Sequence, residues 1–226
     1  YYETNQDNFE LIPGNPIAYW ASESIHNIFK ISYPLDTLDT PVIGIASHND
    51  NKFLRLWNEV NYKQIGFDFS NHIDAKLSKL KWFPYNKGGR FKRWYGNNNY
   101  IVNFQNDGEE LRRFPAAQIK NYNKYFIEGL TWSRISTNNF SVRYHGKGFI
   151  MGDAGPSAFA SKKSIKYILG LLNTKLVDKI LGIFNPTLNY QVGNVSNLPI
   201  IFSEFIQSTS FLIVTQKSNN KLSIFL

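Results

Sequence analysis

The residues best suited to bind another molecule lie between Lys76 and Asn99, where cations alternate with aromatic rings. The cations are Lys76, Lys79, Lys81, Lys87, Arg90, Lys92 and Arg93, and the aromatic residues are Trp82, Phe83, Tyr85, Phe91, Trp94 and Tyr95. No carboxylate occurs from residue 76 to residue 93. Cations pair with phosphates and flat rings stack on bases, so this composition indicates nucleic-acid binding. The alternative is a solvated basic strand pair whose aromatic residues face a core.

The sequence contains few of the motifs that are typical of catalytic or metal sites. The histidines at 26, 48, 72 and 145 lack metal-ligand spacing, and the chain has neither a Gly-x-Ser-x-Gly elbow nor a phosphate-binding Gly-x-x-x-x-Gly-Lys-Ser/Thr loop. Asp68, Asp74 and Lys76 faintly resemble the acidic pair and lysine of metal-dependent nucleases, which leaves a magnesium-dependent nuclease as an alternative. The segment NPIAY (15–19) resembles the Asn-Pro-Pro-Tyr loop of amino-methyltransferases, but it lacks the second proline and no glycine-rich cofactor loop precedes it. We therefore expect the chain itself to be non-catalytic, with no metal or cofactor of its own.

Two further segments contain residues whose positions suggest binding. The glycines of GDAGP (152–156) would let the backbone approach a phosphate, or they simply form a turn. Asn189 and Gln191 carry side chains that can pair with the major-groove edge of adenine. The alternative, which we prefer for these two, is that they cap a helix and satisfy buried backbone groups.

The overall composition is that of a globular protein with an anionic partner. The chain has 226 residues, 42% hydrophobic and 19% charged, which suffices for one large domain or two small ones. Its net charge of +8 favours a polyanion, and the absence of cysteine excludes disulfides and thiolate chemistry and fits a reducing cytoplasm. We find no signal peptide and no apolar run near the ~20 residues that span a bilayer. Because the only methionine is Met151, we expect the chain to be part of a longer protein.

The hydrophobic spacing predicts a mixture of helices and strands that would position these residues. We expect helices from Ser22 to Pro34, over 115–126, and over 165–184 with Ser161 as its N-cap. Strands are expected at 41–46, 81–85, 100–104, 130–135, 140–144 and 148–151, with a strand or short helix at 53–60. Turns at Gly88-Gly89 and 96–99 make 76–99 a basic hairpin. The segment 211–226 fits either a hairpin or a helix.

Longer motifs follow one another in a characteristic order. They are FLRLWNEV (53–60), KWFPYNKGGRFKRWYGNNNYIVNFQNDG (81–108), FIEGLTWSRIS (126–136), FSVRYHGKGFIMGDAGPS (140–157), YILGLLNTK (167–175) and NPTLNYQVGNVSNLPI (185–200). Together they resemble the C-terminal target-recognition region of large adenine-specific DNA methyltransferases, above all BREX phage-exclusion methyltransferases and fused restriction–modification enzymes. The ending Gln-x-Gly-x-x-x-x-Leu-Pro-Ile is also similar to the specificity subunits of Type I restriction systems. The resemblance covers about residues 10–200. One departure is Ser47-His48-Asn49-Asp50, where relatives often have Thr-Gly-Asp/Asn-Asn.

This resemblance implies a fold, a cofactor and partners that composition alone does not show. It implies an α+β fold, in which a β-rich recognition domain with a curved mixed sheet and packing helices spans residues 1–200. Residues 201–226 remain an unassigned tail, either a hairpin or the start of a helical spacer. The parent protein would bind S-adenosylmethionine in an N-terminal methyltransferase domain, which would also be a partner of this region, and would methylate adenine in double-stranded DNA.

The leading prediction is therefore a module that recognises a target sequence in double-stranded DNA for such a methyltransferase. The residues predicted to contact DNA are Lys81, Tyr85, Lys87, Arg90, Lys92, Arg93, Trp94, Asn189 and Gln191. We expect Lys87, Arg90, Lys92 and Arg93 to hold phosphates, and several of the aromatic residues to belong to the core. The alternatives are a single-strand or RNA binder, the nuclease described above, and a protein-interaction domain that docks through a helix over 164–184.

Overall fold

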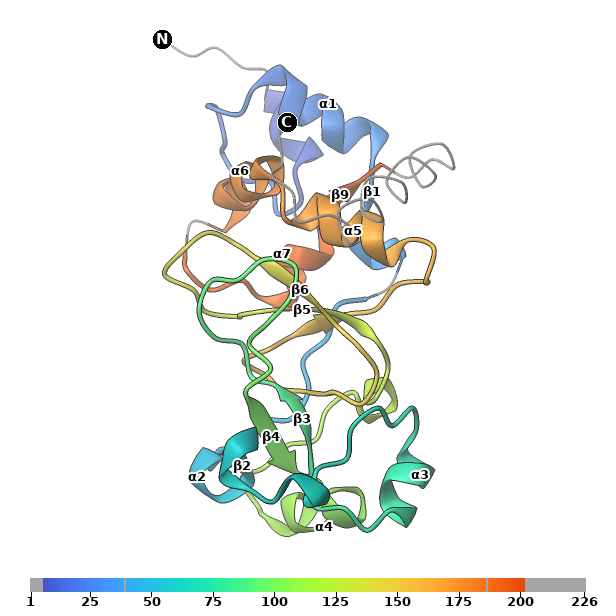
Figure 1. The fold of residues 1–226 in the computed structure, drawn as a ribbon. Helices are drawn as coiled ribbons and strands as arrows, with labels where there is room; N and C mark the ends of the chain where they lie inside the picture. The colour runs from blue at the N-terminus through green and yellow to red at the C-terminus, as the bar shows by residue number, and fades with distance from the viewer. Residues whose placement is uncertain (1–5, 39, 186, 202–226) are drawn as a thin grey trace.

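The computed structural model describes residues 6–38, 40–185 and 187–201 (Figure 1). Figure 1 shows an elongated molecule with a β-rich lobe at one end, a second sheet in the middle and a layer of helices at the other end. The α+β fold expected from the sequence is confirmed. Its strands are divided among separate sheets rather than joined in a single curved one. The interpretation of 211–226 as a hairpin or helix lies outside the described residues.

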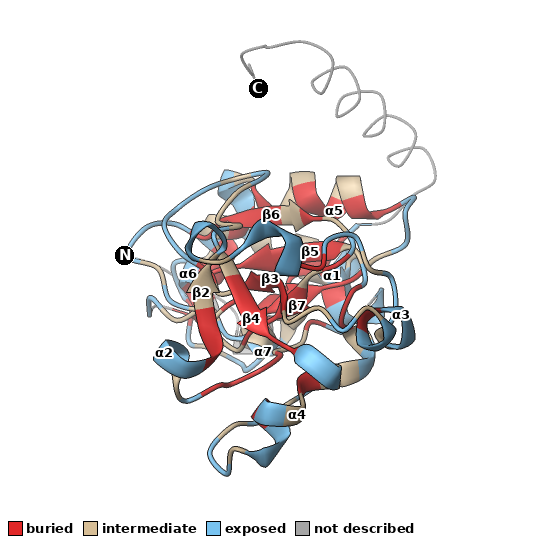
Figure 2. Cartoon of the chain, turned by 60° about the horizontal axis from the view of Figure 1, so that its bottom comes forward, coloured by how far each residue is buried: buried red, intermediate tan, exposed pale blue. Residues whose placement is uncertain are grey.

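The first lobe is built around a mixed four-stranded sheet in the order β2-β4-β3-β7. The strands are β2 (Leu54–Leu56), β3 (Trp82–Asn86), β4 (Tyr100–Asn103) and β7 (Ile150–Met151). β3 and β4 pair antiparallel, whereas β3 and β7 run parallel. Buried aromatic and aliphatic side chains fill the space beneath this sheet, and Figure 2 shows β4 buried while the outer faces of α2 (Asp50–Phe53) and α4 (Gln105–Arg113) are exposed.

The second sheet has one apolar and one polar face. It contains β5 (Gly129–Trp132), β6 (Val142–His145) and β8 (Ser157–Ala158) in the order β6-β5-β8. Alternation along the strands places Leu130, Trp132 and Val142 in the core beneath the helices. The opposite face carries a buried row of Ser157, Thr131 and Arg143, which are directly opposite one another in the register.

The helical layer covers the apolar face of the second sheet. It contains α5 (Ile165–Leu172), α6 (Lys175–Phe184) and α7 (Val192–Ser196), whose apolar sides share one core with β5 and β6. Beyond it lies α1 (Glu23–Ile31), which begins after Ser22 as expected. The short strands β1 (Tyr33–Pro34) and β9 (Pro199–Ile200) pair antiparallel, which brings a segment near the start of the described chain beside its last residues. Two short helices complete this end, η1 (Gln6–Leu11) and η2 (Leu35–Thr37).

The prediction of a single helix over 165–184 is wrong, because the helix is interrupted at Asn173 and Thr174. The side-chain Nδ2 of Asn173 donates to the Val142 carbonyl, and its Oδ1 accepts from the Val142 backbone amide. These two hydrogen bonds connect the end of α5 to β6. Thr174 then caps α6 by accepting a hydrogen bond from the Val177 amide. Ser161 is not the N-cap either: Ser164 holds that position, and the Ser161 hydroxyl accepts from the Ser164 amide.

The helix expected over 115–126 is also wrong. The helix of this region is α4, whose regular part follows left-handed residues at 106–108 and ends before Pro115. After α4, Asn121 and Phe126 both have positive φ angles, which a right-handed helix does not permit. Only the short η5 (Tyr122–Lys124) interrupts this stretch.

The remaining elements are shorter than expected. Residues 41–46 form isolated bridges to three other segments instead of a strand. Residues 53–60 hold the end of α2, then β2, and then the short η3 (Trp57–Glu59). η4 (Tyr62–Gln64) and α3 (His72–Leu77) follow before β3. Among the described residues, we find no helix of the length and apolarity needed to cross a membrane.

Candidate nucleic-acid interface

The basic segment is the connection between two paired strands, as the sequence predicted. β3 and β4 pair from Trp82 opposite Asn103 to Tyr85 opposite Tyr100, and residues 87–99 form the long loop between them. We call this connection the basic loop. Figure 1 shows it, in green, leaving the first lobe and passing beside β5 and β6 of the second sheet. Lys76 and Lys79 are not part of it, since Lys76 lies in α3 and Lys79 follows that helix.

Backbone hydrogen bonds fix the basic loop against the second sheet. The Trp94 amide donates to the Val142 carbonyl at 3.0 Å, and the Tyr144 amide donates to the Trp94 carbonyl at 2.8 Å. Closer to β3, the Gly89 amide donates to Ser133 Oγ at 3.0 Å, and the same hydroxyl donates to the Gly89 carbonyl at 2.9 Å. The loop therefore bridges both sheets, and its side chains project from a defined backbone.

The glycine-rich loop at 152–156 packs against the start of this connection. A Cβ atom on Gly155 would lie 2.2 Å from the carbonyl oxygen of Asn86, a distance at which the backbone itself would have to move. A Cβ atom on Gly88, which has a φ of +84°, would lie 2.7 Å from the Ala154 carbonyl oxygen. Close packing of two backbones thus explains the glycine at 155, in place of the phosphate contact considered from the sequence.

The cations of the basic loop fall into two groups. Arg90 and Lys92 are exposed. Lys87 pairs with Asp50 at 2.6 Å and lies over the Tyr100 ring. Burial alone would raise the pKa of Asp50, but hydrogen bonds from Lys87 and Ser47 and the Lys87 charge outweigh burial and lower that pKa.

Arg93 is the other paired cation. Its guanidinium lies 3.5 Å from Asp178 of α6 and over the Phe91 ring. Lys81, by contrast, precedes β3 and is half-buried, with its ammonium over the Trp82 ring. Three of the five predicted cationic contacts are therefore already engaged with neighbouring side chains, and each of these retains partial exposure.

The two predicted aromatic contacts differ sharply in exposure. Tyr85 is only 4% exposed and its hydroxyl donates to the Ile45 carbonyl at 2.9 Å. Burial also raises the pKa of Tyr85. This side chain belongs to the core, which corrects its assignment as a DNA contact. Trp94 is 42% exposed and has a positive φ of 74°, an unusual conformation for a bulky residue.

Asn189 and Gln191 lie on a segment that pairs with residues 134–136. Gln191 is exposed before α7 and makes no side-chain capping bond. Asn189 is half-buried, and its Oδ1 has no hydrogen-bond partner within the described part of the chain. The capping role preferred from the sequence is therefore not what these side chains do. Residues 135–138 and residues 89–91 of the basic loop line a cavity of about 450 Å³, so Asn189 belongs to a segment beside the loop.

A buried cation lies beneath the basic loop. Arg143 is 1% exposed and forms a bridge to Trp94, and its Nη2 lies 3.5 Å from the Ser133 hydroxyl that holds Gly89. Burial lowers the pKa of Arg143 to about 10, which still leaves it charged at neutral pH. Its Nε and Nη1 make no hydrogen bond within the described residues. Composition gave no signal for this residue, because burial is decided by the fold.

The residues of the nuclease alternative serve the local fold. The Asn71 amide group donates to the Asp74 carboxylate at 2.7 Å, and the Asp74 amide donates back to Asn71 Oδ1 at 2.8 Å, which caps the start of α3. Asp68 lies in a turn against Gly148. Over the described ranges, no three His, Asp or Glu side chains gather as a metal site would require.

The chain is similar to proteins of known class. No family model matches it. It is 38% identical over 209 residues to the adenine-specific methyltransferase PglX of Lacticaseibacillus casei (strain Zhang), a match covering 88% of this chain and 17% of that protein. It is also 38% identical over 211 residues to the adenine-specific methyltransferase BrxX of Escherichia coli O9:H4 (strain HS), covering 90% of this chain and 16% of that protein. The chain is related to adenine-specific methyltransferases.

This similarity confirms the relation to adenine-specific methyltransferases that the ordered motifs indicated. The chain spans about a sixth of the length of these curated relatives. The basic loop, its anchors on β6 and the pairing of 134–136 with 188–190 all lie within the 81–200 stretch that carries most of the motifs.

Proposed function

We propose that this chain is the target-recognition region of an adenine-specific DNA methyltransferase in a BREX-type phage-defence or restriction–modification system. In this proposal, residues 1–200 form the recognition domain and double-stranded DNA is the partner. The observation that carries it is the basic loop, a cation-rich connection without carboxylates whose backbone is anchored on both sheets. Anchoring matters because a rigid loop loses less conformational entropy on binding than a mobile one.

The cations have different roles in this proposal. Arg90 and Lys92 are exposed and contact phosphates directly. Lys87 and Arg93 are paired with Asp50 and Asp178, so they position the loop and add phosphate contacts only by exchanging or sharing those partners. Lys81 precedes β3, at the opposite end of that strand from the basic loop, so its contact with DNA in this proposal is separate from those of the loop.

Base reading is assigned to Asn189 and Gln191, which lie outside the basic loop. Both side chains carry the donor and acceptor pair that matches the N6 and N7 edge of adenine. Gln191 is exposed and can make such a contact directly, whereas the Oδ1 of Asn189 is buried without a hydrogen-bond partner in the described part of the chain and reaches a base once its side chain turns outward. The phosphate contacts would set the register, and these amides would select the bases.

S-adenosylmethionine and the chemistry of methyl transfer belong, in this proposal, to another domain of the parent protein, N-terminal to this region. The glycine-rich loop of this chain is not arranged to bind that cofactor. The glycines able to form a ligand-binding loop, Gly152 and Gly155, instead lie against the backbone and side chains of β3. Methyl transfer is therefore not assigned to any residue of this chain.

The phosphate contacts can be tested by the salt dependence of binding. In the full-length protein, Arg90→Ala with Lys92→Ala should weaken binding to every duplex sequence and reduce the slope of log K against log salt by roughly 2, because each phosphate contact contributes about 0.9. Lys30→Ala, which removes an exposed lysine of α1, is the matched control and should leave the slope unchanged. An unchanged slope in the double variant would show that Arg90 and Lys92 do not contact phosphates and would contradict their assigned role.

The class of function can be tested by methylome sequencing of cells carrying the full-length gene or a catalytically inactive version. We expect one adenine motif to be methylated only with the active gene. Asn189→Ala or Gln191→Ala should relax or change that motif, whereas the Arg90 and Lys92 variants should reduce methylation at all its sites alike. No active-gene-dependent adenine motif, or tighter binding to single strands than to duplexes, would contradict the proposal.

A further inference from the structure

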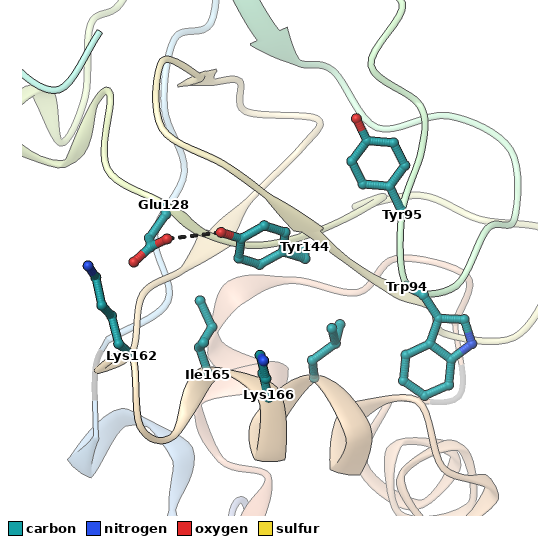
Figure 3. Close-up of a pocket in the computed structure, with 8 residues that line it drawn as sticks. Trp94, Tyr95, Glu128, Tyr144, Lys162, Ile165 and Lys166 are labelled. Atoms are coloured by element: carbon teal, nitrogen blue, oxygen red, sulfur yellow. Dashed lines mark hydrogen bonds between the residues drawn. The ribbon is translucent and has the colours of Figure 1, made fainter. Parts of the chain in front are cut away.

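A second cavity, distinct from the one beside residues 135–138, lies between the basic loop and α5. Its volume is about 530 Å³, within the range of small-ligand sites. Figure 3 shows Trp94 and Tyr95 of the loop at one end, Glu128 and Lys162 at the other, and Tyr144 between them. The apolar side of α5 forms the floor through Ile165 and Leu169. The basic loop thus supplies one end of the cavity through Trp94 and Tyr95.

The aromatic end presents ring faces to solvent at a fixed position. Trp94 is 42% and Tyr95 67% exposed, although large aromatic side chains are normally buried. The Trp94 backbone holds a positive φ of 74° and is hydrogen-bonded on both sides, to Val142 and to Tyr144. A strained and well-anchored backbone at an exposed tryptophan is the kind of arrangement found at ligand sites.

The opposite end supplies charge of both signs. The Glu128 carboxylate accepts a hydrogen bond from the Tyr144 hydroxyl at 2.9 Å, and this hydrogen bond helps raise the pKa of Tyr144, chiefly a result of burial, to about 12. Lys162 and Lys166 come from the turn before α5 and from its first turn. Both lysines line the cavity, Lys162 beside Glu128 and Lys166 on α5 (Figure 3).

We propose that this cavity binds one unpaired nucleotide. The base stacks on Trp94, the phosphate pairs with Lys162 and Lys166, and the Glu128 carboxylate accepts a hydrogen bond from a base amino group. This inference rests on the proposed function, since a nucleotide pushed out of a bound duplex would come from DNA held by the basic loop. A free nucleotide has the same chemistry and is the other source.

Other occupants match the walls less well. A cationic group would suit the aromatic rings and Glu128, but the two lysines would repel it. An inorganic anion would suit the lysines and leave the rings without a role. An apolar peptide side chain would contact only the floor and would form no ion pair with the charged walls. A nucleotide uses each kind of side chain that lines the cavity.

The test uses the full-length protein and two duplexes with the same flanking sequence, one fully paired and one carrying a single bulged 2-aminopurine. We expect at least tenfold tighter binding to the bulged duplex, together with quenching of 2-aminopurine fluorescence as it stacks on Trp94. Trp94→Ala, and separately Lys162→Ala with Lys166→Ala, should remove the preference and, for Trp94→Ala, the quenching. Trp20→Ala, at another exposed tryptophan, should change neither.

Glu128→Gln is the second variant, because it keeps the shape of the side chain and guards against misfolding as the cause of a loss. It should weaken the preference for the bulge severalfold, and thermal melting of each variant checks the fold. Adenosine monophosphate that competes with the bulge would identify free nucleotide as a further source. Equal affinity for both duplexes without quenching would overturn this inference and leave the proposed function standing. Absence of any duplex binding would overturn both.

Discussion

The Ser133 hydroxyl makes two hydrogen bonds to the backbone of Gly89: it accepts one from the Gly89 amide at 3.0 Å and donates one to the Gly89 carbonyl at 2.9 Å. Ser133 follows β5 of the second sheet, whereas Gly89 follows β3 of the first, so this contact joins the two sheets at the root of the basic loop. The side chain that determines the loop position is therefore neither cationic nor aromatic.

Ser133→Ala should loosen the basic loop. The substitution removes two hydrogen bonds to the backbone of Gly89, and because Gly89 is exposed and water can replace the lost partner, we expect each to cost about 0.5–1.5 kcal/mol of unfolding free energy. Hydrogen exchange measured by mass spectrometry should show faster exchange across residues 88–96. Thr137→Ala, an exposed hydroxyl of the neighbouring segment, is the control and should leave exchange there unchanged. Unaltered exchange in Ser133→Ala would show that other contacts suffice to hold the loop.

Gly155→Ala should destabilise the junction between the glycine loop and β3. The added Cβ would lie 2.2 Å from the Asn86 carbonyl oxygen, and backbone must move to make room for it. Overpacking of this kind typically costs about 1–3 kcal/mol. Chemical denaturation should detect the loss, whereas Gly146→Ala, whose Cβ would meet nothing within 4 Å, should stay within about 0.5 kcal/mol of the parent chain. Equal stability of the two variants would contradict the packing explanation.

Gly182→Ala should stabilise the chain. Gly182 lies inside α6, is exposed, and has open space where a Cβ would be. Alanine in a helix is favoured over glycine by roughly 0.5–1 kcal/mol, because the unfolded chain then has less conformational freedom to lose. Thermal melting should show a higher midpoint for the variant. A lower midpoint would mean that α6 needs glycine at this position for a reason other than space.

His145 should make stability depend on pH below neutrality. Its burial, with the nearby Arg143 charge, lowers its pKa from 6.5 to about 4, although a hydrogen bond to the Gly146 carbonyl and the Glu128 charge oppose the shift. Above pH 6.5 the ring is neutral in both the folded and unfolded chains. As pH falls from 6.5 towards 4, only the unfolded chain takes up the proton, so the free energy of unfolding should decrease by up to about 3 kcal/mol.

The His145 contribution can be isolated by substitution. His145→Gln does not titrate, so the difference in unfolding free energy between variant and parent should shrink steadily as pH drops from 6.5 to 4 in denaturant titrations. His48→Asn, an exposed position with positive φ that asparagine tolerates, should leave the pH profile of the parent chain nearly intact. A difference that does not vary with pH would contradict the assignment.

The sequence correctly predicted the elements that depend on residues close together in the chain, such as alternating apolar residues, glycines and prolines. The strands at 82–86 and 100–103 and the connection between them follow from alternation, the glycine pair and the asparagine run. The helix after Ser22 follows from a capping residue and a stopping proline. The prediction of one helix over 165–184 was wrong because the apolar spacing continues past Asn173. Only the hydrogen bonds between Asn173 and Val142 of a distant strand show why the helix is interrupted there.

The sequence by itself determined that the 76–99 segment is rich in cations and aromatic rings and free of carboxylates to residue 93. It also determined that this segment belongs to a chain 38% identical, over about 90% of its length, to adenine-specific methyltransferases. Only the tertiary structure decided which of those groups reach the surface. Arg93 meets Asp178, a residue 85 positions away, and Tyr85 is enclosed by the core, while Arg90 and Lys92 remain exposed. The physical reason is that burial and ion pairing depend on contacts between distant segments, which residue type and spacing do not encode locally.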